Sequence, residues 1–590
     1  MELNLLIDQE KYVVINISKV KSIAGTDNDF FNMSFSPLER LKRILAVCLE
    51  DKAHFPASKV LKTNHLEYFA NYLKYYDPKV GFNVKTIIVE KQYMSLSYLK
   101  DFSKYYSIGY PSYNKYCKRI HFFQKEFEKP EFENFLTSKD DENQSLVSEI
   151  KQSYLGHIVA KPLPNSLIGA TLIRCYDEFF ANQNDQEQKY LTRNRHYFAL
   201  RNYSVNLFGQ NISFKTLVFQ EQDKAVSACA TVAIWMCIHK ISDLFKTTIP
   251  APIEITESAG LGENSGRNIP NQGLLLNQII KAIDSIQANL VSEIFDAKDI
   301  VRVAISRQCT PYKIIKPWKI KRYIYAYLRL EIPILLGYNI VKLNGNHLVT
   351  ITGYRYAKNI EEKNNEQKFY PSSTESMIRT EADKIVRLYS HDDQLGPFSK
   401  IGFDCDGFSN YLQINWRGKD KFNLAIAKLV VIPIIDFIRI KYTDIELFAS
   451  QFQEFTQTIL FSEYDESLDN LFIWDIYIVK SNEYKQQIRN TRIESKLEHL
   501  QNSYPQYIWI ATLKFVDSND SINIIDFVFD ATDTPKSMNL FNLLFYDEMF
   551  KSELCIYFTN ESNSNLKKYT RDIFYGMNYL EKIKRILIPC

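Results

Sequence analysis

The sequence predicts a multidomain protein of the α+β class. With 590 residues the chain is too long for one hydrophobic core, so we expect three domains, or four. Its 45% hydrophobic and 24% charged residues are typical of a folded protein in water. Helical periodicity and strand-like apolar runs both recur along the chain. We place the domains at 1–200, 201–415 and 416–590, with α/β regions on either side of a central domain.

Composition and cysteine use indicate the compartment. The nine cysteines are scattered, odd in number and without a C-x-x-C pair, which is typical of free thiols in a reducing compartment. We expect no signal peptide, and no apolar run approaches the ~18 residues of a membrane span. The net charge of +3 argues neither for nor against a nucleic-acid partner. We therefore expect a cytoplasmic protein without membrane contact; the oligomeric state is not predicted.

The first 200 residues are expected to mix helices and strands, and no motif in them indicates a catalytic site. A predicted helix over Tyr113–Lys125 would carry Cys117 and His121 four residues apart on one face. Such a pair could ligate a metal, but no second pair accompanies it, so plain packing is favoured and no metal is expected. The other predictions are helices at Pro37–Leu49, Asn64–Tyr75 and Met94–Tyr106, and strands at Tyr12–Ile17, Lys85–Val89, Tyr154–Pro162 and Ile168–Cys175.

A helix that begins close to Cys229 is the first chemically informative feature. The polar turn before it contains Gln220 and Gln222, and an apolar run with Ala, Ile and Trp follows without a breaker. Ser227 is a plausible N-cap, which would put Cys229 in the first turn. There the helix dipole favours the thiolate, the nucleophilic form of cysteine. A lone cysteine on an Ala-rich helix is usually a core residue, and Cys237 is expected to be one.

Two further residues stand at predicted strand ends. An apolar strand leads into an Asn-Gly turn, and His347 opens the returning strand. After a polar insertion over residues 357–383, the strand Ile385–Tyr389 runs out into a turn that contains Asp392 and Asp393. Adjacent antiparallel strands would hold the histidine and the aspartate side by side, facing the helix that carries the cysteine.

These residue types are the parts of a covalent thiol mechanism. A cysteine nucleophile needs an imidazole that holds its proton and later gives it to the leaving group, and a carboxylate that fixes the imidazole's tautomer. We predict Cys229, His347 and Asp392 for these roles, and a one-residue shift would make Asp393 the carboxylate instead. Gln222, or its rival Gln220, would aim an amide at the oxyanion together with a backbone N–H of the helix.

The same features resemble the papain-like cysteine peptidases, and among these the bacterial double-glycine leader peptidases of bacteriocin processing and their stand-alone relatives. The resemblance implies a papain-like core that hydrolyses a peptide or isopeptide bond through a thioester acyl-enzyme. It implies a protein or peptide substrate and no cofactor. It covers about residues 210–405 and rests on Gln222 before Cys229 and Ala230, the strand from His347 to Tyr354, and Asp392 four residues before Gly396.

The chain departs from that family at two positions. Ala228 precedes the cysteine where those peptidases usually have Asp, and Asp393 follows Asp392 where they usually have Pro. No transporter or ATP-binding segment is visible. The resemblance therefore points to a stand-alone intracellular peptidase, which could serve in a bacterial defence or toxin system, rather than to export-coupled leader cleavage.

Three other functions are compatible with the sequence. The same residues could support acyl transfer or deamidation, and a degenerate protease fold could act as a binding scaffold. Basic residues also alternate with aromatic ones over residues 313–325, which would suit a nucleic acid, although such a run is more often the solvated face of a helix. A nucleic-acid partner is thus the least expected of the three.

After residue 415 predicted strands and helices alternate, which suggests a separate α/β layer domain. We expect the flanking domains to select the substrate or to restrain the protease. The predicted strands are Leu429–Tyr442, Leu471–Val479, Tyr507–Val516 and Ile522–Asp530, and the predicted helices are Ile445–Phe461, Glu483–Ser503 and Met538–Lys551.

Overall fold

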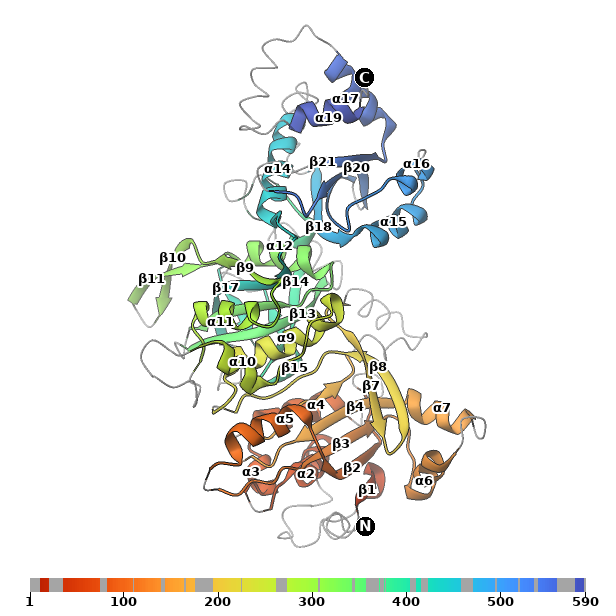
Figure 1. Ribbon diagram of the computed structural model, residues 1–590, viewed down its shortest axis with the longest axis vertical. Coiled ribbons are helices and arrows are strands. Elements are labelled where there is room, and N and C mark those ends of the chain that lie inside the picture. The colour runs from red at the N-terminus through yellow and green to blue at the C-terminus, as the bar shows by residue number, and fades with distance from the viewer. Residues whose placement is uncertain are drawn as a thin grey trace.

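Three groups of strands and helices follow one another along the long axis of the molecule, in the order of the chain (Figure 1). This computed structural model has an N-terminal sheet, a middle sheet and a C-terminal sheet, each with its own helices, and so belongs to the α+β class. The structure describes residues 11–20, 35–52, 54–74, 82–109, 111–138, 144–163, 166–175, 195–223, 225–260, 273–305, 308–341, 345–356, 371, 376, 378–403, 410–414, 423–457, 471–493, 496–517, 520–534, 540–559 and 579–587. Most of the polar insertion at 357–383 lies outside them.

A five-stranded antiparallel sheet forms the centre of the N-terminal region, in the order β1-β2-β3-β4-β5. A separate hairpin, β7–β8, follows it. The strands are β1 Tyr12–Asn16, β2 Thr86–Tyr93, β3 Cys117–Phe123, β4 Tyr154–Ala160, β5 Leu172–Ile173, β7 Arg201–Leu207 and β8 Gln210–Thr216. The helices are η1 Ile17–Lys19, α2 Pro37–Leu49, α3 Ala57–Val60, α4 Asn64–Leu73, α5 Leu96–Asp101, η3 Phe102–Tyr106, α6 Lys129–Thr137 and α7 Gln144–Gln152.

The helix predicted over Tyr113–Lys125 is wrong, because β3 occupies this segment as a central strand. It pairs with β2 on one side and with β4 on the other, and all but one of its residues are buried. A strand buried on both faces loses the alternation of polar and apolar residues that marks a half-exposed strand. Cys117 and His121 therefore lie four strand positions apart, about 13 Å, which is too far to share an ion.

Six strands of the middle sheet close into an antiparallel barrel. β12 pairs with β13 on one side and with β17 on the other, so the order β12-β13-β14-β15-β16-β17 returns to its start. β9 and β6 add to β17 and β13. The strands are β6 Arg195–Tyr197, β9 Leu290–Asp296, β12 Ile334–Ile340, β13 Gly345–Tyr356, β14 Ile385–Asp392, β15 Gly396–Gly402, β16 Leu412–Ile414 and β17 Asn423–Ile435. β6 and β17 belong to this sheet although they lie just outside the predicted 201–415 segment.

Helix α9 lies against the barrel and is fixed to it by a polar contact. The helix packs on β12, β13 and β14, with an almost entirely buried apolar surface. The Thr350 hydroxyl on β13 donates to the backbone carbonyl of Ala233 in α9 at 2.8 Å. The other elements of this region are α9 Cys229–Phe245, α10 Pro252–Ser258, α11 Leu276–Asp284, the hairpin β10 Asp299–Ile305 and β11 Gln308–Ile314, α12 Pro317–Leu328 and η5 Glu381–Lys384.

The C-terminal sheet is an antiparallel meander, β18-β19-β20-β21, accompanied by helices. The helix predicted over Met538–Lys551 is wrong, because β21 fills its first half, pairs with β20 and is followed by α17. The elements are α14 Tyr442–Phe455, β18 Phe472–Lys480, α15 Ser481–Asn490, α16 Lys496–Gln501, β19 Tyr507–Asp517, β20 Asp520–Asp530, β21 Leu540–Phe545, α17 Glu548–Thr559 and α19 Tyr579–Leu587.

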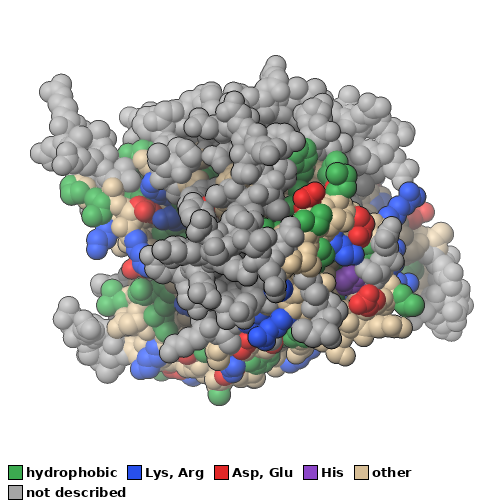
Figure 2. Space-filling model, turned by 90° about the horizontal axis from the view of Figure 1, so that it is seen from above, with side chains coloured by type: hydrophobic (Ala, Val, Ile, Leu, Met, Phe, Trp, Pro, Cys, Tyr) green, Lys and Arg blue, Asp and Glu red, His purple; other side chains and the backbone are tan. Residues whose placement is uncertain are grey.

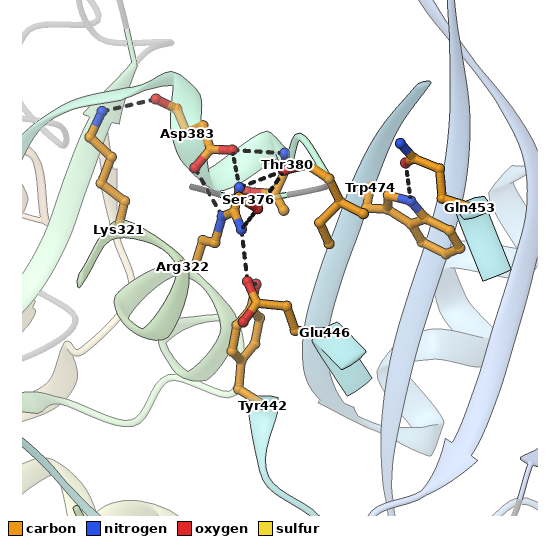
Figure 3. A network of polar contacts seen from close by, with 10 residues as sticks. Lys321, Arg322, Ser376, Thr380, Asp383, Tyr442, Glu446, Gln453 and Trp474 are labelled. Carbon is orange, nitrogen blue, oxygen red and sulfur yellow. Dashed lines mark hydrogen bonds and ion pairs between the residues drawn. The ribbon is translucent and has the colours of Figure 1, made fainter. Parts of the chain in front are cut away.

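A buried polar network at Arg322 of α12 joins the barrel region to the C-terminal helix α14 (Figure 3). The guanidinium binds both carboxylate oxygens of Asp383, at 3.1 and 2.8 Å, and donates to Glu446 at 2.8 Å. Lys321 is also buried and donates to the carbonyl of Asp383 at 3.0 Å. These two residues therefore do not lie on a solvated helix face, as the sequence suggested, and they are not available to a nucleic acid.

Seen from the C-terminal end of the molecule, the described part of the surface carries mixed charge. Lys and Arg side chains lie among Asp and Glu side chains on this face (Figure 2). Within the described ranges, no helix combines the length and the apolar character that crossing a bilayer requires.

Candidate active site

Cys229 is the first residue of α9. Ala228 before it is the N-cap, with extended backbone (φ −73°, ψ 172°), so the prediction of Ser227 as N-cap is wrong. The first N–H groups of a helix have no partner within it, and the cysteine therefore lies where partial positive charge collects. Its side chain is partly exposed, whereas Cys237, two turns further along the helix, is buried. Burial raises the pKa of the Cys237 thiol well above its ordinary value.

The turn before α9 is organised by Asp223, which the sequence analysis did not single out. Its Oδ1 accepts hydrogen bonds from three successive backbone N–H groups, of Ala225, Val226 and Ser227, at 3.0, 2.8 and 2.8 Å. Its Oδ2 accepts from the Tyr106 hydroxyl at 2.7 Å. An aspartate that opens a turn before a helix is a local signal that could have identified it. The carboxylate fixes the path along which the chain enters the helix.

His347 and Asp392 lie side by side because β13 and β14 are neighbours in the barrel. The register pairs Thr350 with His391, which brings the start of β13 level with the end of β14. His347 Nε2 donates to Asp392 Oδ1 at 3.0 Å, and both side chains are buried. The same oxygen accepts from the backbone N–H of Gln394 at 3.0 Å, which holds the carboxylate in place.

The surroundings of His347 favour its protonated form. Burial by itself disfavours the charged imidazolium. The negative charges of two aspartates, together with hydrogen bonds to Asp392 and to Cys229, outweigh burial and raise the pKa of His347 well above its ordinary value. Because Nε2 faces the carboxylates, Nδ1 is the ring nitrogen that remains for the Cys229 sulfur. The structure thus brings the predicted cysteine, histidine and aspartate into one hydrogen-bonded series.

Asp393 is the second carboxylate beside the imidazole. Its Oδ1 lies 3.4 Å from His347 Nε2 and forms no hydrogen bond within the described residues. Burial, with a further contribution from the charge of Asp392, raises the pKa of Asp393 to about 6 despite the opposing attraction of His347. Of the two carboxylates that the sequence left open, Asp392 is the one hydrogen-bonded to the ring.

Tyr338 completes the cluster, and the sequence analysis missed it. It lies directly opposite His347 in the β12–β13 pair, with the ring centroids 5.5 Å apart in an edge-on arrangement. Its hydroxyl donates to Asp392 Oδ2 at 3.3 Å. The tyrosine therefore covers the imidazole and binds the carboxylate at once. The hairpin register counted back from the Asn-Gly turn is the signal that could have found it.

The two candidate glutamines differ in burial. The Gln220 side chain is 2% exposed, and Gln222 is partly exposed. Among the described residues neither side chain forms a hydrogen bond, so the structure does not link either amide to Cys229.

Two other histidines, His391 and His239, lie close in the sequence to the site residues but make their contacts outside the site. His391 faces away from the cluster, with Nε2 donating to the carbonyl of Leu217 at 3.0 Å. His239 packs on the Trp235 ring and contacts the Tyr203 hydroxyl at 3.3 Å. Burial lowers the pKa of both imidazoles, to about 4 for His391 and about 3 for His239.

One cluster in the described residues has the composition of a metal site. One ligand atom each of His347, Asp392 and Asp393 lie within 4.8 Å of one another. Imidazole and carboxylate ligands suit a divalent ion such as zinc. The nitrogen that would ligate such an ion is His347 Nε2, which donates its proton to Asp392 in this structure. The site can therefore hold either this proton or a metal ion at Nε2, but not both.

Comparison with known proteins gives no family for this chain: no protein-family model, no curated protein and no solved structure matches it. The function must therefore be argued from the geometry of the site itself.

Proposed function

We propose that the chain is a cysteine peptidase, with Cys229 as nucleophile, His347 as general acid and base, and Asp392 as the group that orients the imidazole. The observation that carries the proposal is the imidazole of His347, which is hydrogen-bonded to Asp392 on one side and to Cys229 on the other. A cysteine at a helix start beside an imidazole is the arrangement that covalent thiol catalysis uses.

The layout of the elements supports a papain-like core. In that fold a long helix carries the cysteine and an antiparallel barrel carries the histidine and its partner. Here α9 begins with Cys229, and the barrel strands β13 and β14 supply His347 and Asp392. The Thr350–Ala233 hydrogen bond ties the helix to the barrel three residues after the histidine. A fixed separation of nucleophile and base is what covalent catalysis requires.

The proposed reaction runs in two steps. The Cys229 sulfur attacks the carbonyl carbon of a peptide or isopeptide bond, and the oxyanion accepts hydrogen bonds from the start of α9 and from a glutamine amide. His347 gives its Nδ1 proton to the leaving amine, and a thioester remains. His347 then takes a proton from water as the hydroxide attacks the thioester, which releases the acid and restores the starting Cys229–His347 pair.

A thiol-reactive activity probe tests this proposal. Incubation of the full chain with a vinyl sulfone or acyloxymethyl ketone peptide, followed by peptide mass mapping, should find the label on Cys229. If Cys229 were labelled equally fast in the native wild type, in unfolded protein and in the His347→Ala variant, the proposal would be contradicted. The histidine would then contribute nothing to the reactivity of the thiol. Product masses from a peptide library then separate hydrolysis from transfer of the acyl group to an amine.

A further inference from the structure

Helix α4 of the N-terminal region contacts both loops that supply the candidate active site. His65, near the start of this helix, is 8% exposed. Its Nε2 donates to the backbone carbonyl of Asp393 at 2.8 Å, and its Nδ1 lies 3.3 Å from Glu221 Oε1. Asp393 directly follows the hydrogen-bonded carboxylate, and Glu221 lies between the two candidate glutamines. One side chain from a distant part of the sequence therefore joins both loops.

Glu221 in turn fixes the glutamine loop to the N-terminal sheet. Its Oε2 accepts from the backbone N–H groups of Leu167 and Ile168 at 2.7 and 2.9 Å. Its own N–H donates to the carbonyl of Ile168 at 3.0 Å. The loop before α9 is thus held by the segment that precedes β5, and His65 adds the link from this loop to the aspartate turn.

A second residue of α4 packs on the same turn. Tyr68 lies three positions after His65, on the same face of the helix. Its hydroxyl donates to the carbonyl of Pro397. At Gly396, where β15 begins, a Cβ would lie 2.2 Å from the Tyr68 ring, so only glycine allows this approach. The α4 face is therefore shaped to the turn between β14 and β15.

We propose that His65 is a positioning residue, through which the N-terminal region holds the glutamine loop and the Asp392–Asp393 turn at a fixed separation around Cys229. This inference rests on the proposed peptidase function. It makes the N-terminal region a part of the catalytic unit rather than a detachable module for substrate selection. His65 touches neither the cysteine nor a reacting atom, and it acts through Glu221 and the Asp393 backbone.

The test compares three variants of the full chain: His65→Ala, His65→Gln and His54→Ala. Glutamine keeps an amide N–H that can reach the Asp393 carbonyl. His54 is a matched control, because this partly exposed histidine lies in the same region, and its ring packs on Tyr113 without a side-chain hydrogen bond among the described residues. The readouts are kcat and KM for a cleaved peptide, and hydrogen–deuterium exchange of residues 217–228 and 391–397.

Loss of His65 should lower kcat by on the order of tenfold to a hundredfold with KM nearly unchanged, because misplaced catalytic groups affect the chemical step more than binding. Exchange should become faster in both segments. His65→Gln should recover most of kcat and protection, and His54→Ala should match the wild type. Unchanged kcat and unchanged exchange in His65→Ala would overturn the proposal, as would faster exchange confined to α4.

Exchange also separates this inference from the peptidase proposal. If the wild type cleaves no peptide, faster exchange of both segments in His65→Ala still supports the positioning role, and unchanged exchange still removes it. If His65→Ala does not fold, His65→Gln decides: normal kcat and exchange in this variant support the hydrogen bond to Asp393. A loss of kcat in His65→Gln with wild-type exchange in both segments would overturn it.

Discussion

Among the described residues, the buried histidines of the N-terminal sheet can be compared with the buried His347 at the end of barrel strands β13 and β14. In the sheet, the Tyr154 hydroxyl bridges His121 Nδ1 and His157 Nδ1 at 2.9 and 3.0 Å. In the barrel, His347 binds Asp392 and Cys229. The pKa of His121 and of His157 is lowered well below the ordinary value, whereas that of His347 is raised well above it.

The difference lies in whether a carboxylate is free to stabilise the imidazolium. His121 has a carboxylate nearby, at 3.6 Å from Glu90, but Arg119 already binds that group at 2.7 Å. Burial is therefore the largest influence on the pKa of His121, and it lowers this pKa together with the positive charge of Arg119. In the barrel cluster no arginine competes among the groups that act on His347, and two aspartates outweigh the same cost of burial. A buried histidine beside a carboxylate is thus a candidate acid–base group only where that carboxylate is not already paired with another positively charged side chain.

The largest expected effect separates the two thiols of α9. Cys229→Ala should lower turnover by at least about a thousandfold, because the nucleophile is removed, while Cys237→Ala should leave it close to the wild-type value. Stability should show the reverse order, since Cys237 is buried and its sulfur contacts the carbonyl of Pro333 at 3.4 Å. Steady-state kinetics and urea unfolding of both variants measure this. A large loss of stability in Cys229→Ala with normal turnover would mean that Cys229 is a core packing residue and not the nucleophile.

The same histidines give the next comparison. His347→Asn should abolish turnover to a similar extent, because no group then exchanges a proton with the thiol. His121→Asn should keep turnover, yet lose about 1–3 kcal/mol of stability, because the buried Tyr154 hydroxyl loses one of its two partners. The measurements are kcat/KM and the free energy of unfolding. Equal loss of activity in both variants would mean that the N-terminal cluster also takes part in the chemistry.

A smaller effect is expected at the carboxylates. Asp392→Asn should lower kcat by about a hundredfold or more, because an amide in place of the carboxylate no longer stabilises the imidazolium and can favour the wrong tautomer. Asp393→Asn should lower it by less than about tenfold, since this carboxylate lies at 3.4 Å and forms no hydrogen bond to the ring among the described residues. The pH profile of kcat/KM checks both. The opposite order would make Asp393 the orienting group.

Local signals in the sequence account for the elements that carry the site. A helix start at Cys229 and strand ends near His347 and Asp392 can be predicted, because turn residues and apolar runs mark them. The prediction of Tyr113–Lys125 as a helix failed, because a strand buried on both faces shows no alternation. The helix predicted over Met538–Lys551 failed for a related reason, since five of the six residues of β21 are apolar.

The contacts that position the site could not be predicted in this way. Tyr338 is visible only once the register of the β12–β13 hairpin is known. His65 and Asp393 lie 328 residues apart, and nothing in either segment indicates the other. Closure of the barrel through β12 and β17 is likewise a long-range pairing. Such contacts depend on the packing of whole regions, whereas sequence patterns report on a few neighbouring residues.

The smallest expected effect concerns the pH dependence of stability through Asp393. Burial raises the pKa of this carboxyl to about 6, whereas an Asp in an unfolded chain titrates near 3.9. The folded protein therefore binds this proton more tightly than the unfolded chain does. The resulting stability is fully present below about pH 4 and is lost as the pH rises through about 6, and it amounts to on the order of 3 kcal/mol.

Asp393→Asn removes this titration and keeps the shape of the side chain. Urea unfolding between about pH 4 and pH 7 should therefore show the wild type losing stability relative to the variant. The unfolded chain of either protein loses the His347 proton near pH 6.5, and this contribution cancels between them because Asp392 still raises the pKa of His347 in the variant. Burial raises the pKa of Asp101 to about 7. This group titrates in both proteins, so its contribution to the stability difference cancels. Parallel stability curves would mean that Asp393 is ionised throughout, so that two carboxylates share one imidazolium at the end of the barrel.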